Sequence, residues 1–409
     1  MFAQIRESIR RLTRQDYDDI TFEAVEVSLD EAERAAHQSA AYLVSQAKAD
    51  GSFLYRRNLN PSVYVRPRYN WLRHAGTLYA LAEYYERYGG EDVLAVIANG
   101  VECMRRDCLV PLPKFPGCLA VWTRPDAQVT EELECAKLGG AGLALVAMSR
   151  LARLNPNLVN MEEQRGLARF ILAMQKPDGS FYSKYIPSTG GLSDTWTSLY
   201  YPGEAALGLV SLYQLDNDAL WVKAARNALI FLAKSRAGSK RVPADHWALI
   251  ATEEVWTFLS DQDRQELRTH ARQIVEAILL DQVWQSNSPF HGSFVEDGRT
   301  TPNATRLEGL LAAEFLFRDE PPFHRSLRSC MNRAMRFALN ARYSKGQETG
   351  AVPRAIGQIG GDDPKTRSFN RRASEIRIDY VQHSLSAYLK WARFLKRRML
   401  WRPIAKNKL

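Results

Sequence analysis

The sequence lacks the features that mark several large classes of protein. Its 409 residues contain no uninterrupted apolar run of about 18 residues, so no membrane-spanning helix is expected. The first eleven residues lack the apolar stretch of a secretory signal peptide, and a cytoplasmic location is the expectation. The five cysteines form no CxxC pair or other metal-ligand spacing. Their odd number suits a reducing compartment, and we interpret them as free, mostly buried thiols.

Cofactor and nucleic-acid motifs are also missing. No dinucleotide-binding Gly-rich turn, P-loop or Gly-x-Ser-x-Gly elbow occurs, so dehydrogenase, kinase and α/β-hydrolase activities lose support. We expect no cofactor, no metal and no nucleic-acid partner. The net charge is +9. Much of that excess lies at the termini, in Arg6, Arg10, Arg11 and Arg14 and in the segment 393–408. We interpret these basic residues primarily as the solvent-exposed faces of helices. Peripheral contact with a membrane through them is the alternative.

What the sequence does contain is a repeat. Gly-Ser-Phe occurs at Gly51, Gly179 and Gly292, each time after an apolar helical segment. Two of the approaches are nearly identical, since residues 46–53 read QAKADGSF and residues 175–181 read QKPDGSF. Units of a repeat bury their apolar faces only against their neighbours. The copies therefore predict one architecture for the whole chain.

Two kinds of predicted helix alternate along the chain, and helices that are apolar nearly all round are expected inside amphipathic ones. The amphipathic segments are 30–48, 91–101, 162–173, 220–234, 262–280 and 323–343. The segments rich in small and apolar residues are 71–88, 136–154, 202–214, 245–258, 305–317 and 378–395. This alternation predicts an all-α fold, an (α/α)6 toroid.

The toroid is expected to form a single domain over residues 29–398, with an N-terminal arm at 1–28 and a basic tail at 399–409. The helix at 30–48 should pair with the last inner helix and close the ring. No strand pattern competes seriously, and residues 20–27 are the best short candidate.

The repeats carry a resemblance. The Gln-x-x-(x)-Asp-Gly-Ser-Phe turns resemble the QW-type repeats of squalene cyclases and the related turns of protein prenyltransferases, which are α/α toroids. The alternating helices also resemble six-hairpin glycosidases, polysaccharide lyases and enzymes of the N-acylglucosamine 2-epimerase type. Because the shared motifs are structural turns, the resemblance implies architecture far more than activity.

Two of these activities lack their signature residues. The resemblance to squalene-type cyclases would imply an Asp-x-Asp-Asp acid, and only Asp18-Asp19 and Asp362-Asp363 occur. A prenyltransferase zinc site would need Asp-x-Cys, whereas Asp107 and Cys108 are adjacent. The segment from His246 to Glu253 weakly resembles the helices of the epimerases that carry histidine, tryptophan and glutamate. The resemblance implies histidines that act as acid and base.

The aligned inner helices predict a ring of side chains at one level of a central cavity. Its members are Gly76, Gly140, Glu204, Trp247, Glu308 and His383. Glu204 and Glu308 come from repeats two places apart, and two carboxylates about 5 to 9.5 Å apart work across a glycosidic bond. Their structural alternative is helix capping or pairing with a basic residue such as Arg306.

Histidines stand at three inner-helix starts, at His74, His246 and His383. An imidazole titrates near neutrality and suits proton transfer. We take Glu204, Glu308, His246 and His383 as the candidate catalytic set. Arg73, Lys137 and Arg306 are candidates for binding an anionic group of the substrate. Alternatively, these cations neutralise the carboxylates of Glu204, Asp245 and Glu308.

Aromatic and polar residues gather toward the same end of the predicted ring, where flat rings suit the apolar faces of a sugar. The candidate substrate-binding residues are Tyr69, Arg73, His74, Lys137, Asp194, Trp196, Tyr201, Asp245, Trp247 and Arg306. The loop 183–196 is expected to cover the cavity mouth. The segment 344–377 is read as a second mouth loop or a flexible surface insertion.

These observations favour an enzyme that acts on a sugar or an anionic glycan by acid/base catalysis in the cavity, as a hydrolase, lyase or epimerase. The partner would be a small or polymeric anionic carbohydrate. Two alternatives stay open. One is an isoprenoid-handling cyclase or transferase with an apolar aromatic cavity. The other is a non-catalytic binding or scaffold toroid, in which the cavity is filled and both glutamates are locked in salt bridges.

Overall fold

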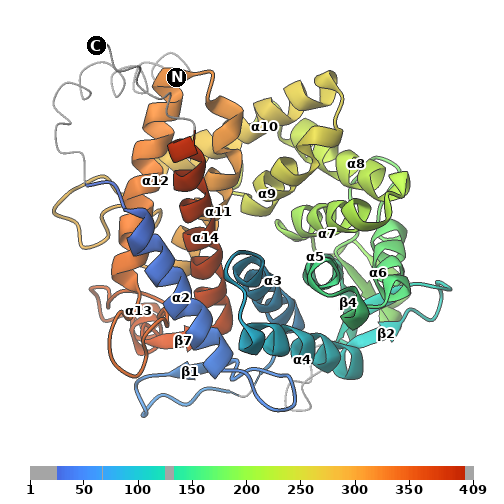
Figure 1. Ribbon diagram of the computed structural model, residues 1–409, viewed down its shortest axis with the longest axis horizontal. Helices are drawn as coiled ribbons and strands as arrows, with labels where there is room; N and C mark the ends of the chain where they lie inside the picture. The colour runs from blue at the N-terminus through green and yellow to red at the C-terminus, as the bar shows by residue number, and fades with distance from the viewer. Residues whose placement is uncertain (1–24, 67, 125–132, 401–409) are drawn as a thin grey trace, which may run out of the picture.

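The computed structural model describes residues 25–66, 68–124 and 133–400, and in this part of the chain six inner helices alternate with six outer ones (Figure 1). The inner helices are α3 (Trp71–Tyr88), α5 (Leu138–Leu154), α7 (Tyr201–Asp216), α9 (His246–Val255), α11 (Thr300–Ala313) and α14 (Ile378–Leu400). The outer helices are α2 (Leu29–Ser45), α4 (Glu91–Asp107), α6 (Met161–Ala173), α8 (Ala219–Arg236), α10 (Asp261–Leu280) and α12 (Pro321–Ala341). The predicted α/α toroid is confirmed.

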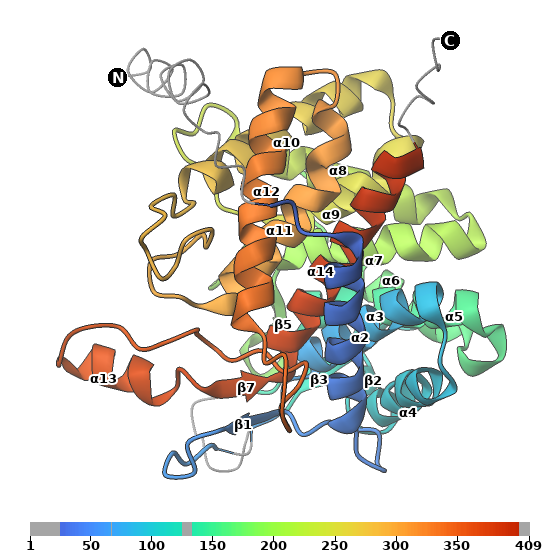
Figure 2. The same ribbon diagram turned by 60° about the vertical axis from the view of Figure 1, so that its left-hand side comes forward.

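The inner helices close into a ring. Each of them contacts the next along the chain, and α14 returns to contact α3. The outer helix α2 packs along α14, where Figures 1 and 2 both show the two side by side. This contact confirms the predicted closure, because the first helix of the chain covers the last inner one.

Small residues allow the inner helices to approach closely. A methyl group on Gly208 of α7 would lie 2.7 Å from the carbonyl oxygen of Gly142 on α5. A methyl group on Gly142 would in turn lie 2.5 Å from the carbonyl oxygen of Glu204. Alanine cannot be accommodated at either position without moving a backbone, so the small-residue pattern reports helix contact.

The Gly-Ser-Phe turns follow outer helices, as predicted, and share one backbone conformation. Gly51, Gly179 and Gly292 have φ values of 82°, 92° and 86°. A methyl group on each would lie 2.1 to 2.5 Å from a carbonyl oxygen of the next outer helix. The following phenylalanines, Phe53, Phe181 and Phe294, are all buried. Left-handed backbone and close approach together require glycine here.

A fourth copy of this turn follows α12 and was not recognised in the sequence. Gly350 has a φ of 92°, and a methyl group there would lie 2.0 Å from the carbonyl oxygen of Gln38 on α2. The Tyr343 amide donates to the Ala351 carbonyl, as the Val283 amide donates to that of Ser293. The serine and phenylalanine are replaced by Ala351 and Val352, so the motif was hidden although its geometry is kept.

Short strands join the loops at the end of the ring where the inner helices begin. Within the described residues, β2 (Leu109–Pro111), β3 (Leu119–Thr123), β4 (Cys135–Lys137), β5 (Lys184–Ile186) and β6 (Gly191–Ser193) form an antiparallel sheet in that order. A second pair joins β1 (Arg56–Asn58) to β7 (Glu375–Arg377). These strands leave the all-α architecture unchanged, and with three to five residues each they are too short to show an alternating pattern in the sequence.

Other expectations need smaller corrections. The segment 344–377 contains the helix α13 (Pro364–Arg371) and β7, so much of it is ordered. Helix α11 begins at Thr300 rather than near residue 305, because Pro302 is tolerated in a first helical turn. Single-turn 3-10 helices lie at η1 (Pro156–Leu158), η2 (Pro187–Thr189), η3 (Trp256–Phe258) and η4 (Glu314–Phe317).

Two of the expectations concern the ends of the chain: the basic residues there and the candidate strand at 20–27. Arg6, Arg10, Arg11, Arg14, Arg402, Lys406 and Lys408 lie outside the described residues, as do residues 20–24 of the candidate strand; residues 25–27 are not in a strand. On α14, Arg393 and Arg398 pair with Glu253 and Glu26. Over the ranges that the structure covers, none of the helices combines the length and apolar character of a membrane span.

Candidate functional site

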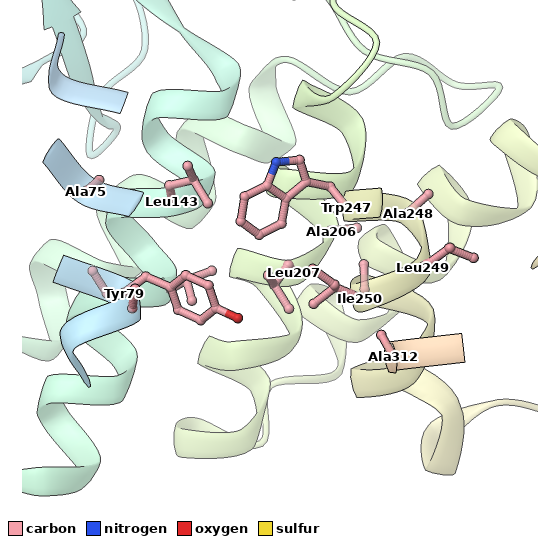
Figure 3. Packing of buried hydrophobic residues seen from close by; sticks show 14 of the residues in the cluster. Ala75, Tyr79, Leu143, Ala206, Leu207, Trp247, Ala248, Leu249, Ile250 and Ala312 are labelled. Atoms are coloured by element: carbon pink, nitrogen blue, oxygen red, sulfur yellow. The ribbon is translucent and has the colours of Figure 1, made fainter. Parts of the chain in front are cut away.

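Three residues of the predicted ring come together at its centre. Glu308 of α11 and His383 of α14 form a hydrogen bond, with 2.8 Å between Glu308 Oε1 and His383 Nδ1. Trp247 of α9 lies beside them, its ring centroid 6.1 Å from that of His383. Figure 3 shows Trp247 and Tyr79 pointing toward one another between the inner helices. Glu308 is fully buried, whereas the His383 side chain is 12% exposed, so solvent reaches the pair at the imidazole.

A second imidazole joins this pair. His246, the first residue of α9, has its ring centroid 5.6 Å from that of His383 and 5.1 Å from that of Tyr200. Neither nitrogen of His246 has a hydrogen-bond partner among the described residues. Burial, and then the neighbouring His383, hold the pKa of His246 well below its usual range. His246 is therefore a neutral imidazole at pH 7, with both nitrogens uncommitted.

Glu204 lies in the first turn of α7 and is fully buried without a partner for Oε2 in the described part of the chain. It occupies space left by Gly139 of α5, where an added methyl group would lie 2.0 Å from Glu204 Oε2. Burial, and then the charge of Asp245, raise the pKa of Glu204 to about 8. At neutral pH this carboxyl group is a proton donor.

Asp245 holds the start of α9 in place. Its Oδ1 accepts a hydrogen bond from the Ala248 amide as the N-cap of the helix. Its Oδ2 accepts from Arg236 of α8 at 2.8 Å. Asp245 therefore fixes the first turn of α9, which begins with His246. The charge of the Asp245 carboxylate is balanced by Arg236.

His74 and Tyr69 lie elsewhere, between α3 and α4. His74 Nε2 donates to the Gly100 carbonyl at 3.0 Å, and its Nδ1 accepts from the Tyr69 hydroxyl at 2.7 Å. That hydroxyl accepts from the Phe53 amide in the first Gly-Ser-Phe turn. Burial lowers the pKa of His74 to about 4. Both nitrogens are used to tie a turn to a helix, so the structure brings this pair to a different place from the other two histidines.

The predicted cationic residues divide into paired and unpaired groups. Arg73 bonds to the Tyr55 hydroxyl and to Asp379, and Arg306 pairs with Asp281. Lys137, at the end of β4, stands directly opposite Lys184 of β5. Neither lysine has a carboxylate partner among the described residues. Like charges directly opposite on a strand pair repel each other, which favours an anion between them.

Lys184 is not a residue that the sequence singled out, and it links this strand pair to an exposed aromatic. Its ammonium lies 4.7 Å from the ring centroid of Trp196, which is 47% exposed. Trp196 meets Tyr201 edge-on at 5.6 Å. Tyr201 in turn packs on Gly139 beside Glu204. Asp194 is engaged by Lys176 at 2.7 Å. These contacts extend from the surface to Glu204.

A buried charged cluster lies between the inner helices, on the side of Tyr79 that faces away from Trp247. It was not predicted from the sequence. Glu83 of α3 accepts hydrogen bonds from the Tyr79 hydroxyl and from Ser386, each at 2.9 Å. It also pairs with Lys390 at 3.4 Å and lies 3.7 Å from Arg150 of α5. We call Tyr79, Glu83, Arg150, Ser386 and Lys390 the floor of the ring.

A signal for the floor was present in the sequence. Glu83 and Lys390 each follow a ring position, Gly76 and His383, by seven residues, which is about two helical turns on the same face. Charged residues on the inward face of an apolar helix are costly unless paired. Opposite charges at equivalent steps of neighbouring helices therefore predict a buried pair.

A groove between α8 and α10 on the outside of the ring is lined by residues such as Lys234, Gln265 and Gln273, and by none of the predicted site residues. In the ranges that the structure describes, no three histidine, cysteine or acidic side chains are arranged to hold a metal ion.

The ring of paired helices defines the chain as an α/α toroid, and solved structures share it. A sugar epimerase from a ruminal bacterium aligns with 90% of this chain and 98% of its own, at 12% identity and a TM-score of 0.63. D-mannose isomerase aligns with 91% of this chain and 99% of its own, at 11% identity and a TM-score of 0.64. An α-1,6-mannanase of glycoside hydrolase family 76 from Salegentibacter aligns with 90% of this chain and 99% of its own, at 13% identity and a TM-score of 0.55.

At these identities the likeness establishes the fold, and activity has to be argued from the site. Comparison of the sequence with protein-family models and with curated proteins finds no match.

Proposed function

We propose that this chain is a carbohydrate-active enzyme that moves a proton at the carbon next to the carbonyl group of a sugar, as an epimerase or isomerase. The observation that carries the proposal is the meeting of two imidazoles, His246 and His383, at the centre of the ring with Glu308 bonded to one of them. The likeness to a sugar epimerase and to D-mannose isomerase supports it at the level of the fold.

The chemistry follows from the groups present. His246, which its lowered pKa keeps neutral, takes the proton from C2 of the open-chain sugar. The electrons of the C–H bond form the C1=C2 bond while those of the carbonyl π bond move onto O1, which gives an enediolate. His383, which must enter this step with both ring nitrogens protonated, delivers a proton from Nε2 to C2 on the opposite face as the C1=O bond re-forms, which gives the epimer. Delivery of that proton to C1 instead, with transfer of the C2 hydroxyl proton to O1, gives the ketose. No redox step occurs, and the two histidines exchange roles in the reverse direction.

The two glutamates have different roles in this scheme. Glu308 accepts a hydrogen bond from Nδ1–H of His383, which leaves Nε2 as the nitrogen that releases the transferred proton and later takes one back. Glu204, protonated at pH 7 by virtue of its raised pKa, donates a hydrogen bond to the carbonyl oxygen as negative charge develops there. A carboxyl group kept neutral by burial is suited to that task.

The substrate is proposed to carry an acidic group. Lys137 and Lys184 face each other without a carboxylate partner among the described residues, and Lys137 lies two residues before Gly139, on which Glu204 packs. A uronate carboxylate seated there would relieve the repulsion between the two ammonium groups. Trp196 and Tyr201 would then pack against the apolar face of the sugar.

The test is proton exchange at C2. The protein is incubated in D2O with a panel of neutral and uronic reducing sugars, and loss of the C2 proton signal is followed by NMR together with product identity. We expect exchange in the parent and its loss in His246→Asn and His383→Asn. His37→Asn, a change at an exposed histidine, is the matched control and should exchange like the parent. A folded parent that exchanges no C2 proton on any sugar of the panel would overturn the proposal.

Hydrolysis is the second candidate, because Glu204 has the raised pKa of a general acid. Its weakness is that the second carboxylate, Glu308, is hydrogen-bonded to His383. The same variants separate the two activities. Release of reducing ends from an acidic oligosaccharide that survives in His246→Asn but is lost in Glu204→Gln favours the hydrolase. If the parent neither exchanges, cleaves nor binds any glycan, the scaffold alternative is favoured.

A further inference from the structure

The imidazole of His246 is placed by its backbone, because neither ring nitrogen has a hydrogen-bond partner among the described residues. Its ring packs among those of Trp247, Tyr200 and His383, whose centroids lie 4.9, 5.1 and 5.6 Å away. His246 is also the first residue of α9, a helix of ten residues, and helix ends fray. The position of this imidazole therefore depends on how firmly the first turn of α9 is held.

Two neighbouring inner helices press on that turn. A methyl group on Gly309 of α11 would lie 3.0 Å from Cα of His246. A methyl group on Gly203 of α7 would lie 2.7 Å from the amide nitrogen of Ala248. Contacts this close between backbones fix the turn on the sides that face α7 and α11.

A third support comes from the outer layer of the ring. Arg236 of α8 donates a hydrogen bond from Nη1 to Nε2 of His270 on α10, at 3.2 Å, since an arginine can only donate. Its Nη2 donates to Asp245 Oδ2 at 2.8 Å, and Asp245 Oδ1 accepts from the Ala248 amide at 3.1 Å. We call His270, Arg236 and Asp245 the α9 clamp. Its three contacts connect two outer helices to the turn that carries His246.

The clamp is buried and its charges balance. The side chains of Arg236 and Asp245 are 11% and 0% exposed, and His270 is buried as well. Burial, and then the charge of Arg236, lower the pKa of His270 to about 3, so its imidazole is neutral at pH 7 and can accept from Arg236. One guanidinium is thus matched by one carboxylate. Because each terminal nitrogen of Arg236 has its own partner, the planar guanidinium fixes the direction of both bonds.

We propose that Arg236 is a positioning residue, which holds His246 in place for the transfer of the C2 proton by fixing Asp245 against the first turn of α9. His270 fixes Arg236 in turn. This inference rests on the proposed function, in which His246 takes that proton. The clamp touches no reacting atom and acts through the backbone of residues 245–248. A displacement of a reacting group by about 1 Å can lower a rate by roughly 10²-fold.

The test uses variants that remove or keep single contacts of the clamp. Arg236→Met removes both hydrogen bonds of the guanidinium and keeps an apolar stem. His270→Leu removes the acceptor alone, whereas His270→Gln keeps an acceptor for Arg236. Arg226→Met is the matched control. Arg226 also joins α8 to α10, through Asp263 at 2.6 Å, but it stands ten residues before Arg236, roughly 15 Å along the helix.

Two measurements are made on each variant of the full chain. The first is C2 exchange, where we expect kcat to fall by about 10- to 100-fold in Arg236→Met and His270→Leu, with KM changed by less than about twofold. His270→Gln should recover most of the rate, and Arg226→Met should exchange like the parent. The second does not depend on turnover. In protein labelled at histidine with 15N and 13C, the ring signals of His246, assigned with His246→Asn, should shift in Arg236→Met and stay in place in Arg226→Met.

The outcomes separate the clamp from the proposed function. If the rates follow thermal stability in every variant, Arg226→Met included, the clamp is purely structural and the inference is overturned, while exchange in the parent leaves the function standing. If the parent exchanges no C2 proton, the function fails and the His246 signals decide alone. Signals that do not move in Arg236→Met then overturn the clamp, and signals that move retain it as the support of His246. If Arg236→Met fails to fold, His270→Leu, which leaves the ion pair in place, is judged by the same outcomes.

Discussion

One buried carboxylate at each level of the ring, Glu83 at the floor and Glu204 above it, has a different set of partners. At the floor, Glu83 accepts hydrogen bonds from Tyr79 and Ser386 and pairs with Lys390. At the level where the inner helices begin, Glu204 and His246 are just as deeply buried and have unpartnered atoms within the described residues. Buried polar groups are normally satisfied, and each exception calls for an explanation. The difference supports the proposal that the upper level, and not the floor, binds the substrate.

The largest expected effect belongs to the upper level. His246→Asn and His383→Asn should each lower the rate of C2 exchange by about 10²- to 10⁴-fold, which is the usual contribution of a positioned acid or base. His246→Asn should not shift the thermal midpoint by much, because His246 makes no hydrogen bond that asparagine would lose among the described residues. His383→Asn also removes the partner of buried Glu308 and should lower the midpoint. Thermal melts and exchange rates on the same samples check this. A large loss of stability in His246→Asn would contradict the division between the two levels.

The apolar turns at the same end of the ring should behave as structure. Phe294→Ala removes a buried aromatic and should cost about 3 to 5 kcal/mol of unfolding free energy. Trp196→Ala, a change at an exposed aromatic, should cost less than about 1 kcal/mol. Urea denaturation of both variants measures the difference. Equal costs would mean that Trp196 is packed as part of the core and is not a binding surface.

A carboxylate at each level provides a matched pair. Glu83→Gln leaves buried Lys390 without its carboxylate partner and should cost about 3 kcal/mol at pH 7. Glu204→Gln replaces a group that is mostly neutral at that pH and should change stability by less than about 1 kcal/mol. The two unfolding free energies are compared directly. A stability loss in Glu204→Gln as large as that in Glu83→Gln would assign Glu204 to the structure.

The pH dependence of stability should sharpen this contrast. The pKa of Glu204 is raised from its ordinary value near 4.5 to about 8 in the folded chain, so the folded state binds a proton more tightly than the unfolded state. The contribution of Glu204 to stability is therefore fully present below pH 4.5 and is lost as the pH rises toward 8. The parent should lose on the order of 2 kcal/mol more than Glu204→Gln between pH 5 and pH 8. Parallel pH profiles of the two proteins would show that Glu204 is not buried as described.

The smallest expected effect concerns the surface. Lys184→Met should raise the KM for an acidic sugar by about fivefold, equivalent to roughly 1 kcal/mol, and leave the KM for a neutral sugar unchanged. Lys234→Met, in the groove between α8 and α10, is the control and should change neither. Equal effects of Lys184→Met on acidic and neutral sugars would mean that the lysine pair does not select for charge.

The sequence by itself determined the architecture of this protein. Helix type, helix order and the turn at Gly51, Gly179 and Gly292 depend on local properties: the spacing of apolar and small residues, and a backbone conformation that favours glycine. The closure of the ring by α2 on α14 followed from counting the repeats. The turn at Gly350 was not predicted, because the serine and phenylalanine of the motif are replaced by other residues there, although the backbone conformation of the glycine is the same.

Only the tertiary structure decided which polar residues of the ring are paired. Glu308 and His383 lie 75 positions apart in the chain and meet at 2.8 Å, while Glu204 at an aligned step meets no partner among the described residues. His74 and His246 both stand at inner-helix starts, yet one ties a turn to α4 and the other faces the centre. Periodicity places a side chain on a face, but the rotation of each helix and the side chains of its neighbours fix the contact. Partner choice and burial, and with them the pKa values of Glu204 and His246, therefore depend on packing between segments distant in the sequence.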